Sequence, residues 1–139
     1  MQIAQRLYQG IEIDGETIGL ITYMRTDGTN LSKDAVSDFR GFIINQYGKE
    51  YLPDNPINYS GKKAKNAQEA HEAIRPTDIT RSPDSVKKYL STDQQKLYNL
   101  IWTRALSSQM ETAKFDRNTI TITSTCLLYT SPSPRDSVV

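Results

Sequence analysis

The sequence contains one cysteine and one histidine, and its positive and negative charges almost balance. A single cysteine, Cys126, cannot close an intrachain disulfide and cannot supply a cysteine-rich metal site. Lys and Arg together number 17 and Asp and Glu 16, which gives a formal net charge of +1. Domains held to nucleic acid by their net charge are usually strongly basic, and this sequence is not. Binding to nucleic acid would here need a local basic face.

The sequence also lacks a long apolar run. No stretch approaches the ~18 apolar residues that a membrane-spanning helix needs, and the first residues lack the apolar core of a signal peptide. We therefore expect a cytoplasmic protein with no membrane partner. The 139 residues are 37% hydrophobic and 24% charged, a composition typical of one globular domain rather than of a disordered chain.

Both ends of the sequence look accidental. Residues 126–139 differ in character from the rest, and Cys-Leu-Leu-Tyr-Thr-Ser-Pro-Ser-Pro-Arg-Asp at 126–136 resembles a translated adapter from transposase-based sequencing libraries. We expect this segment to be a non-native tail and exclude it from fold prediction, the alternative being a natural Ser/Pro-rich tail. Met1 opens in mid-helix without a capping residue before it. The expectation is an internal fragment of a longer protein.

The first half of the chain predicts a helix, a hairpin and a second helix. Apolar residues at helical spacing predict a helix over 2–8, and two β-prone runs flank the Asp14-Gly15 turn pair, the second run continuing to residue 22. Ser32 is a good N-cap for a helix to Tyr47, with Gly48 as its stop. Its apolar stripe is Ala35, Val36, Phe39, Ile43 and Tyr47.

The second half predicts further helices and one strand. Residues 49–67 have the composition of an exposed loop, followed by a short helix over 68–74. Pro83 opens a helix to Leu90, and Ser91 with Gln94 forms a capping box for a long helix ending near residue 113. Residues 118–124 alternate as a strand that has no partner within the sequence. The apolar stripe of the long helix is Leu97, Leu100, Ile101, Ala105 and Met110.

Tyr23 and Arg25 are the first candidates for chemistry. If the second β-run stays extended to this point, both side chains lie on the same face. A tyrosine hydroxyl ionises near pH ~10 in water and is a poor nucleophile at neutral pH, but a guanidinium favours the phenolate and clamps phosphate. The pair suits covalent attack on a phosphodiester. The spacing is equally typical of a tyrosine that only packs at a strand end.

A second constellation surrounds the single histidine. On a helix His71, Glu72 and Arg75 would fall within one turn, where histidine and arginine hold a phosphate and move a proton. Alternatively, Glu72 and Arg75 form a solvated pair. A zinc site is excluded because the second histidine of the HExxH pattern is absent. Lys62, Lys63 and Lys65 either contact phosphates or are simply solvated.

Taken together, these motifs resemble one family. The string Leu-Ile-Thr-Tyr-Met-Arg-Thr-Asp at 20–27, followed by Asn-Leu-Ser at 30–32, closely resembles the nucleophile motif of the bacterial type IA DNA topoisomerase I family. The resemblance covers residues 1 to about 124 and includes four further motifs in the expected order. They are Tyr-Leu-Pro at 51–53, the stretch 66–77, Leu-Tyr-Asn-Leu-Ile-Trp at 97–102 and Ser-Gln-Met at 108–110.

Details of the motifs separate subfamilies. Topoisomerase III relatives usually carry proline where this sequence has Met24 and a second histidine where it has Glu72, so the form resembles topoisomerase I. Reverse gyrase shares this core and stays open as a nearer alternative. Two positions depart from the family pattern, Gly28 in place of serine and Gln9 in place of an acidic residue. These departures put the local hydrogen bonding in doubt and leave the nucleophile in place.

The resemblance implies an α+β, mainly helical fold. It would be a winged-helix-like domain with one β-hairpin over residues 1–112, which carries the catalytic tyrosine. Residues 113–125 would begin the adjoining arch domain with its first strand. A helix followed by a hairpin wing is compatible with that architecture.

The resemblance also implies the chemistry. Tyr23 would attack a backbone phosphate in a single-stranded segment of duplex DNA and form a 5′-phosphotyrosine link, allowing strand passage and religation without ATP. Arg25 would stabilise the phosphate charge. Phosphate and DNA contacts would come from Gln5, Tyr8, Asp27, His71 and Arg75.

The implied enzyme relaxes negatively supercoiled DNA and needs Mg²⁺, which the family binds in an upstream Toprim domain absent from this sequence. We expect no metal ligand in this fragment, no activity from it alone, and a monomeric enzyme at the nucleoid. Two alternatives remain open. The chain is a winged-helix module that binds nucleic acid without chemistry, or it does not fold as a stable unit because its last strand is unpaired.

Overall fold

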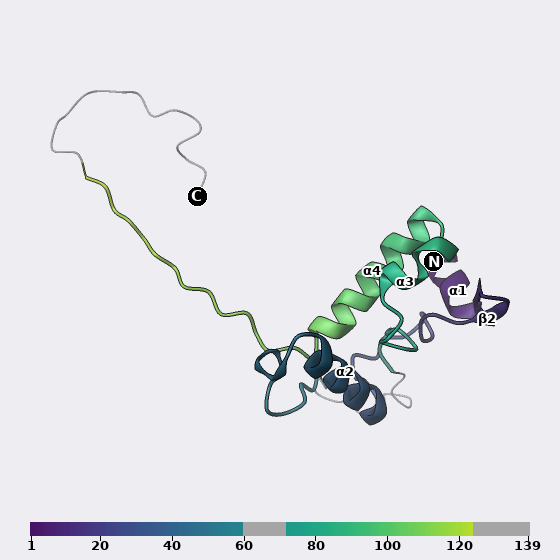
Figure 1. Ribbon diagram of the computed structural model, residues 1–139, viewed down its shortest axis with the longest axis horizontal. Coiled ribbons are helices and arrows are strands. Elements are labelled where there is room, and N and C mark those ends of the chain that lie inside the picture. Colours follow the sequence, from purple (N-terminus) through teal and green to yellow (C-terminus); the bar gives the residue numbers. More distant parts are fainter. Residues whose placement is uncertain (60–71, 124–139) are drawn as a thin grey trace, which may run out of the picture.

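The computed structural model describes residues 1–59 and 72–123. Within these residues the fold is α+β and mostly helical, with one two-stranded antiparallel sheet (Figure 1). None of the described helices is long and apolar enough to cross a membrane. The elements in order are α1 (Gln2–Gln9), β1 (Ile11–Ile13), β2 (Glu16–Ile18), α2 (Lys33–Gln46), η1 (Lys49–Tyr51), α3 (Pro83–Val86), η2 (Lys87–Tyr89) and α4 (Thr92–Ser107).

The predicted hairpin is confirmed, but its second strand is shorter than expected. Asp14 and Gly15 both have positive φ values, 50° and 89°, as a tight two-residue turn requires, and Ile11 pairs with Ile18 across the strands. The ladder ends at Ile18. Beyond that point the backbone bonds to segments far away in sequence, so the run to residue 22 is not a continuation of the hairpin.

The capped helices begin where the sequence predicts. The Ser32 hydroxyl accepts a hydrogen bond from the Ala35 amide, and Ser91 and Gln94 form the reciprocal capping box of α4. Helix α2 ends at Gln46, and Gly48 follows with a φ of 104°. These boundaries depend on contacts within a few residues, which is why local sequence predicts them.

Helix α4 ends at Ser107, six residues before the predicted end. The reason is Gln109, which is 1% exposed and donates through Nε2 to the Ile57 carbonyl at 3.0 Å. The Glu111 amide donates to the Tyr51 carbonyl at 2.8 Å. These bonds draw the chain out of the helix. The expected stripe is also wrong at Leu100, which is 55% exposed.

One other prediction fails in the described residues, and one stays untested. Glu72 to Ile74, the described part of the short helix expected over 68–74, are not helical; residues 68–71 lie outside the described part. The Ala73 amide donates to Asn30 and its carbonyl accepts from Thr22, so its backbone groups are used across the fold. The strand expected over 118–124 was expected to have no partner in this sequence and stays a prediction; its described residues, 118–123, form no ladder with any described segment, and Figure 1 shows them running away from the helices.

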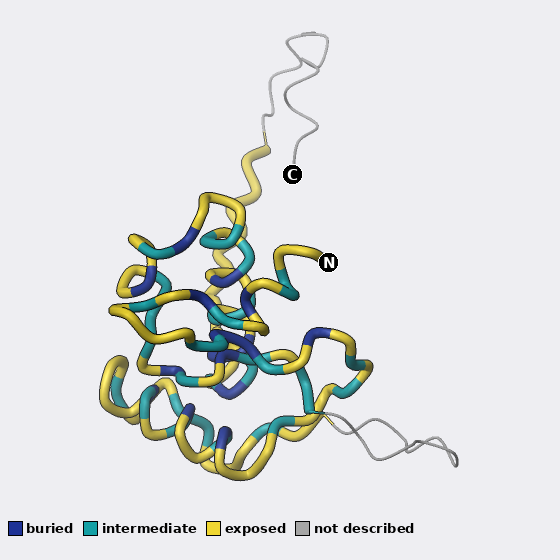
Figure 2. The backbone as a smooth tube through the Cα atoms, turned by 90° about the vertical axis from the view of Figure 1, so that its right-hand side faces the viewer, coloured by how far each residue is buried: buried dark blue, intermediate teal, exposed yellow. Residues whose placement is uncertain are grey.

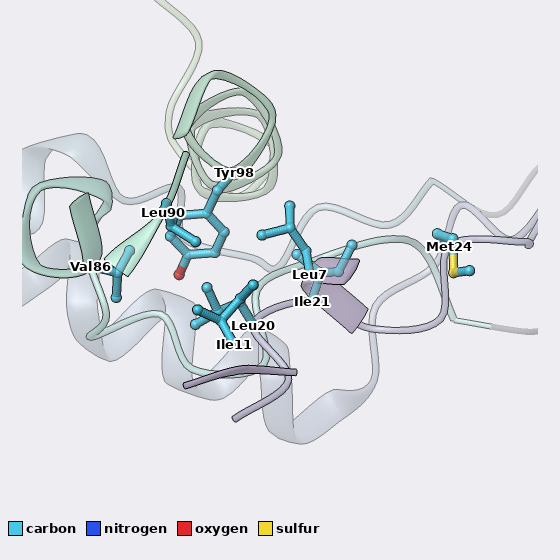
Figure 3. Close-up of a cluster of buried hydrophobic side chains, with 8 residues drawn as sticks. All are labelled: Leu7, Ile11, Leu20, Ile21, Met24, Val86, Leu90 and Tyr98. Atoms are coloured by element: carbon cyan, nitrogen blue, oxygen red, sulfur yellow. The ribbon is translucent and has the colours of Figure 1, made fainter. Parts of the chain in front are cut away.

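Two buried clusters lie against opposite halves of α4. Figure 2 shows the buried stretches of the backbone in dark blue. The first cluster joins α1 and the segment after the hairpin to the N-terminal half of α4; its largest fully buried members are Tyr98, Leu7, Leu20 and Ile21 (Figure 3). Through Leu20 and Ile21, this cluster anchors the segment that carries Tyr23 in the hydrophobic core. The second joins α2 to the C-terminal half of α4 and consists of Phe39, Ile43, Ile79, Ala105 and Leu106.

Candidate active site

Tyr23 projects from a segment that is anchored in the core. Leu20 and Ile21 are each 1% exposed, and Met24 on the other side is 8% exposed. The ring of Tyr23 itself is 44% exposed. A reactive side chain is positioned well when the residues on both sides of it are locked by packing, because the backbone then has little freedom. Tyr23 is therefore accessible and held at a fixed place.

A second segment, residues 73–77, is hydrogen-bonded along the one that precedes Tyr23. The Thr22 amide donates to the Arg75 carbonyl at 2.9 Å, and the Arg75 amide donates to the Thr22 hydroxyl at 3.0 Å. The Thr22 hydroxyl in turn donates to the Ala73 carbonyl at 3.0 Å. Further along, the Thr77 amide donates to the Leu20 carbonyl at 3.0 Å. These bonds place Arg75 beside the residue that precedes Tyr23.

Helix α1 contacts the same segment from the other side. The Leu20 amide donates to the Leu7 carbonyl at 2.8 Å, and a Cβ added to Gly19 would lie 2.7 Å from the Tyr8 carbonyl oxygen. Only glycine allows this close approach. As a result, the rings of Tyr8 and Tyr23 meet edge to face, with their centroids 5.4 Å apart. An edge-to-face pair is a favourable aromatic geometry.

Three separate segments therefore meet here: the rings of Tyr8 and Tyr23 are in contact, and the Arg75 backbone is hydrogen-bonded to Thr22, the residue before Tyr23. Gln5 lies one turn before Tyr8 and is partly exposed. With Gln2, Arg6 and Gln9 it lines a shallow cavity of about 360 Å³ on α1. The side-chain amides of Gln2, Gln5 and Gln9 therefore share one cavity on the helix that also carries Tyr8.

The Arg75 guanidinium forms a two-bond ion pair with Glu72. Nε donates to Oε1 at 2.5 Å and Nη2 to Oε2 at 3.3 Å, and Nη1 donates to the Pro76 carbonyl at 3.0 Å. Glu72 Oε1 also accepts from the Ser32 amide at 3.1 Å. Burial raises the pKa of Glu72, but the hydrogen bonds from Arg75 and Ser32 outweigh it, so the pKa lies below its ordinary value. Glu72 is charged at neutral pH and orients Arg75.

Arg25 and Asp27 are both exposed, and the expected geometry of Tyr23 and Arg25 is wrong. Thr22, Met24 and Arg25 lie in bends rather than in an extended strand, so the alternation that would put both side chains on one face does not hold. The bend continues at Thr26, whose hydroxyl accepts from the Gly28 amide at 3.0 Å. Among the described residues, Arg25 and Asp27 form no ion pair.

Some candidates lie outside the described residues. These are His71 and the lysines Lys62, Lys63 and Lys65. Conversely, the sequence reasoning missed Thr22, Gly19 and Thr77, which hold the two segments together. Thr22 and Thr77 stand inside the two quoted motifs, so their hydroxyls were a signal that was available. Within the described residues no cluster of three or more His, Cys, Asp or Glu side chains is arranged to hold a metal ion.

Comparison with known proteins decides the family. The family profile described as DNA topoisomerase matches residues 1–131. The chain belongs to the DNA topoisomerase family. DNA topoisomerase 1 of Rickettsia felis is 60% identical over 116 residues, which cover 84% of this chain and 15% of that protein. DNA topoisomerase 1 of Helicobacter pylori is 48% identical over 122 residues, 88% of this chain and 16% of that protein.

A solved structure agrees with these sequence matches. Full-length topoisomerase I from Thermotoga maritima matches with a TM-score of 0.66 and 44% identity, over 80% of this chain and 16% of that one. The chain thus spans only about 15% of the length of the curated relatives. It corresponds to part of a bacterial topoisomerase I, and the resemblance found in its motifs is confirmed.

Proposed function

We propose that this topoisomerase chain supplies the nucleophile of a type IA reaction, and that the nucleophile is Tyr23. The observation that carries the proposal is the exposed tyrosine on an anchored backbone, paired with Tyr8 and placed next to the Arg75 segment. In the reaction the Tyr23 hydroxyl loses its proton and its oxygen bonds to a phosphorus of single-stranded DNA. The bond from phosphorus to the 3′ oxygen breaks, and that oxygen leaves as a hydroxyl after it takes up a proton.

Religation is the same step in reverse. The 3′-hydroxyl attacks the phosphotyrosine, the tyrosine oxygen leaves, and the phosphodiester is restored after another strand has passed. No ATP is consumed, because the phosphotyrosine link conserves the energy of the broken bond. The enzyme would thereby relax negatively supercoiled DNA.

The cationic side chains have different proposed roles. Arg25 is exposed and has no ion-pair partner among the described residues, so it is available to stabilise charge on the attacked phosphate. Arg75 is held by Glu72 in a fixed orientation, which suits it to position a neighbouring phosphate. Gln5, Tyr8 and Asp27 would contact the DNA strand, and His71 would complete the phosphate contacts.

Mg²⁺ is proposed to act from outside this chain. The described residues do not fit a metal site, so no step on them is assigned to the ion. We propose that a Toprim domain elsewhere in the longer protein binds it. The tyrosine-bearing segment would be a winged-helix-like domain, followed by the start of an arch. Because the chain spans about 15% of its relatives, we further propose that it does not relax DNA alone, and that the whole enzyme is a cytoplasmic, nucleoid-associated monomer.

The test is a chimera in which residues 1–125 replace the matching segment of the Thermotoga maritima enzyme. With Mg²⁺ and an end-labelled oligonucleotide, we expect a covalent adduct that disappears in Tyr23→Phe. Tyr47→Phe is the matched control, because Tyr47 is also 44% exposed and lies at the end of α2. A folded chimera that binds DNA without forming adduct would contradict the proposal and favour a binding module without catalysis.

A further inference from the structure

A cavity of about 550 Å³, which we call the α4 pocket, lies between the loop that follows the nucleophile motif and α4. Its walls are the loop after the nucleophile motif, the Ala73 segment and the last turns of α4. The residues that matter here are Gly28, Thr29, Tyr59, Ala73, Ile74 and Arg104. We infer that the α4 pocket binds one nucleotide of the strand that Tyr23 attacks. This inference rests on the proposed function, and it adds a subsite for the DNA substrate.

The pocket is close to the nucleophile along two of its walls. Gly28 and Thr29 follow Tyr23 by five and six residues. On the other wall, the Ala73 carbonyl accepts the hydrogen bond from Thr22, the residue before Tyr23. A strand held with a phosphate at Tyr23 therefore has its next nucleotides within reach of this pocket.

The aromatic wall of the pocket is fixed in place. The Tyr59 hydroxyl donates to the Ser108 carbonyl at 2.8 Å, and the Tyr59 carbonyl accepts from the Thr29 hydroxyl at 3.0 Å. Two residues earlier, the Ile57 carbonyl is held by the buried Gln109. Tyr59 is nevertheless 48% exposed. A tyrosine whose hydroxyl and backbone carbonyl are both hydrogen-bonded, and whose ring is still exposed, is held ready for contact with a ligand.

The lining has the chemistry that a nucleotide needs. Of the described residues that line the pocket, Arg104 is the one that carries a charge; it is exposed and has no ion-pair partner in the described part of the chain. The rest is mainly apolar, including Ala73 and Ile74. Single-stranded nucleic acid is bound by aromatic side chains that stack on bases and by cations that contact phosphates. Tyr59 and Arg104 supply one of each.

The size of the cavity agrees with this occupant. Pockets for small ligands typically measure roughly 300–1,000 Å³, and the α4 pocket lies within that range. Among the lining residues that the structure describes, the one charge is the positive charge of Arg104, so an anionic ligand is favoured over a cationic one. A nucleotide combines an anionic phosphate with a flat base. The DNA strand that binds at Tyr23 would supply such a nucleotide to the α4 pocket.

The first test measures binding without chemistry. In the chimera that carries Tyr23→Phe, Arg104→Gln is expected to weaken binding of a single-stranded oligonucleotide several-fold and to reduce the slope of log affinity against log salt by about 0.7, the value of one phosphate contact. Lys96→Gln is the control, because Lys96 is an exposed cation on α4, two turns earlier. Arg104→Lys, which keeps the charge, is expected to retain most of the affinity and the slope. An Arg104→Gln variant that is folded and behaves like Lys96→Gln would overturn the inference.

The second test locates the base. Oligonucleotides carrying 5-iodouracil at successive positions are irradiated with the same chimera, and the crosslinked residue is identified by mass spectrometry. We expect a crosslink to Tyr59 at one or two positions near the cleavage site, and none to the exposed Tyr51. If the chimera with Tyr23 forms adduct but Tyr59 crosslinks at no position, the pocket is wrong and the proposed function stands. If no adduct forms either, the proposed function itself fails.

Discussion

Thr22 and Arg75 are joined by two hydrogen bonds, one between their backbones and one from the Arg75 amide to the Thr22 hydroxyl. The two residues are 53 positions apart in sequence. This contact links the backbone next to Tyr23 with the segment that carries the Glu72–Arg75 ion pair. The Thr22 hydroxyl is therefore the side-chain group that, together with the backbone bonds, fixes the Arg75 segment beside Tyr23.

Thr22→Val removes that hydroxyl and keeps the shape of the side chain. The Arg75 amide and the Ala73 carbonyl both lose a partner in a partly buried place, so we expect a loss of about 1–3 kcal/mol in the free energy of unfolding. Urea denaturation followed by circular dichroism measures this change. Thr22→Ser, which keeps the hydroxyl, should retain most of the stability. Equal losses in the two variants would show that the hydroxyl does not hold the segments together.

Gly19→Ala tests how closely α1 must approach the nucleophile segment. The added Cβ would lie 2.7 Å from the Tyr8 carbonyl oxygen, which is backbone and cannot rotate away. We expect α1 to shift, the Tyr8–Tyr23 pair to separate, and the rate of adduct formation in the chimera to fall at least tenfold, a loss of about 1.4 kcal/mol.

The control is Gly41→Ala within α2. A Cβ at Gly41 meets nothing within 4 Å, and alanine is favoured over glycine in a helix by about 1 kcal/mol. That variant should be as active as the parent and slightly more stable. Normal adduct formation by Gly19→Ala would mean that the edge-to-face pair has no role in positioning Tyr23.

The sequence predicted the parts of the fold that local chemistry determines. The Asp14-Gly15 turn and the Ser91–Gln94 capping box each involve residues no more than a few positions apart. All the residues that determine these two features are therefore visible in a short stretch of sequence. Tyr23 was predicted as the nucleophile from its motif alone. Its exposure, and its contact with Tyr8, needed the structure because they depend on how α1 packs.

The remaining features depend on partners that are distant in sequence. Helix α4 ends at Ser107 because Gln109 bonds to Ile57, 52 positions earlier, and no local pattern at Gln109 indicates this. Likewise, Ala73 is not helical because its backbone groups bond to Asn30 and Thr22. The Glu72–Arg75 pair did form at the predicted spacing, although the helix expected to carry it did not.

The ion pair predicts a defined response to acid. The pKa of Glu72 is lower in the folded state than its ordinary value of 4.5. The folded chain therefore stabilises the ionised carboxylate relative to the protonated acid. The resulting stability is fully present above pH 4.5 and is lost as the pH falls through the lower, folded value. Urea midpoints measured from pH 6 to about 3 should therefore fall less steeply in Glu72→Gln than in the parent.

Glu50→Gln provides the control for that measurement, because Glu50 is exposed and has no ion pair among the described residues. Its acid profile should follow the parent. A Glu72→Gln profile that is parallel to the parent over the whole range would mean that the carboxylate contributes nothing to folding.

Tyr98 predicts a response at the other end of the pH scale. Its ring is fully buried and its hydroxyl donates to the Arg81 carbonyl at 2.7 Å; burial raises the pKa of Tyr98 from 10 to about 12. The folded chain therefore keeps this proton more tightly than the unfolded chain. The corresponding stability is fully present below pH 10 and is lost as the pH rises toward 12, by roughly 3 kcal/mol.

Tyr98→Phe separates this effect from the titration of lysines, which also occurs near pH ~10. At pH 8 the variant should be less stable by about 1 kcal/mol, because the Arg81 carbonyl loses its hydrogen bond. Between pH 10 and 11.5 the parent should lose stability faster than the variant, so that their urea midpoints converge and then cross. Midpoints that stay a constant distance apart would show that Tyr98 does not ionise on unfolding, and the buried hydroxyl would then have no part in the alkaline limit of the fold.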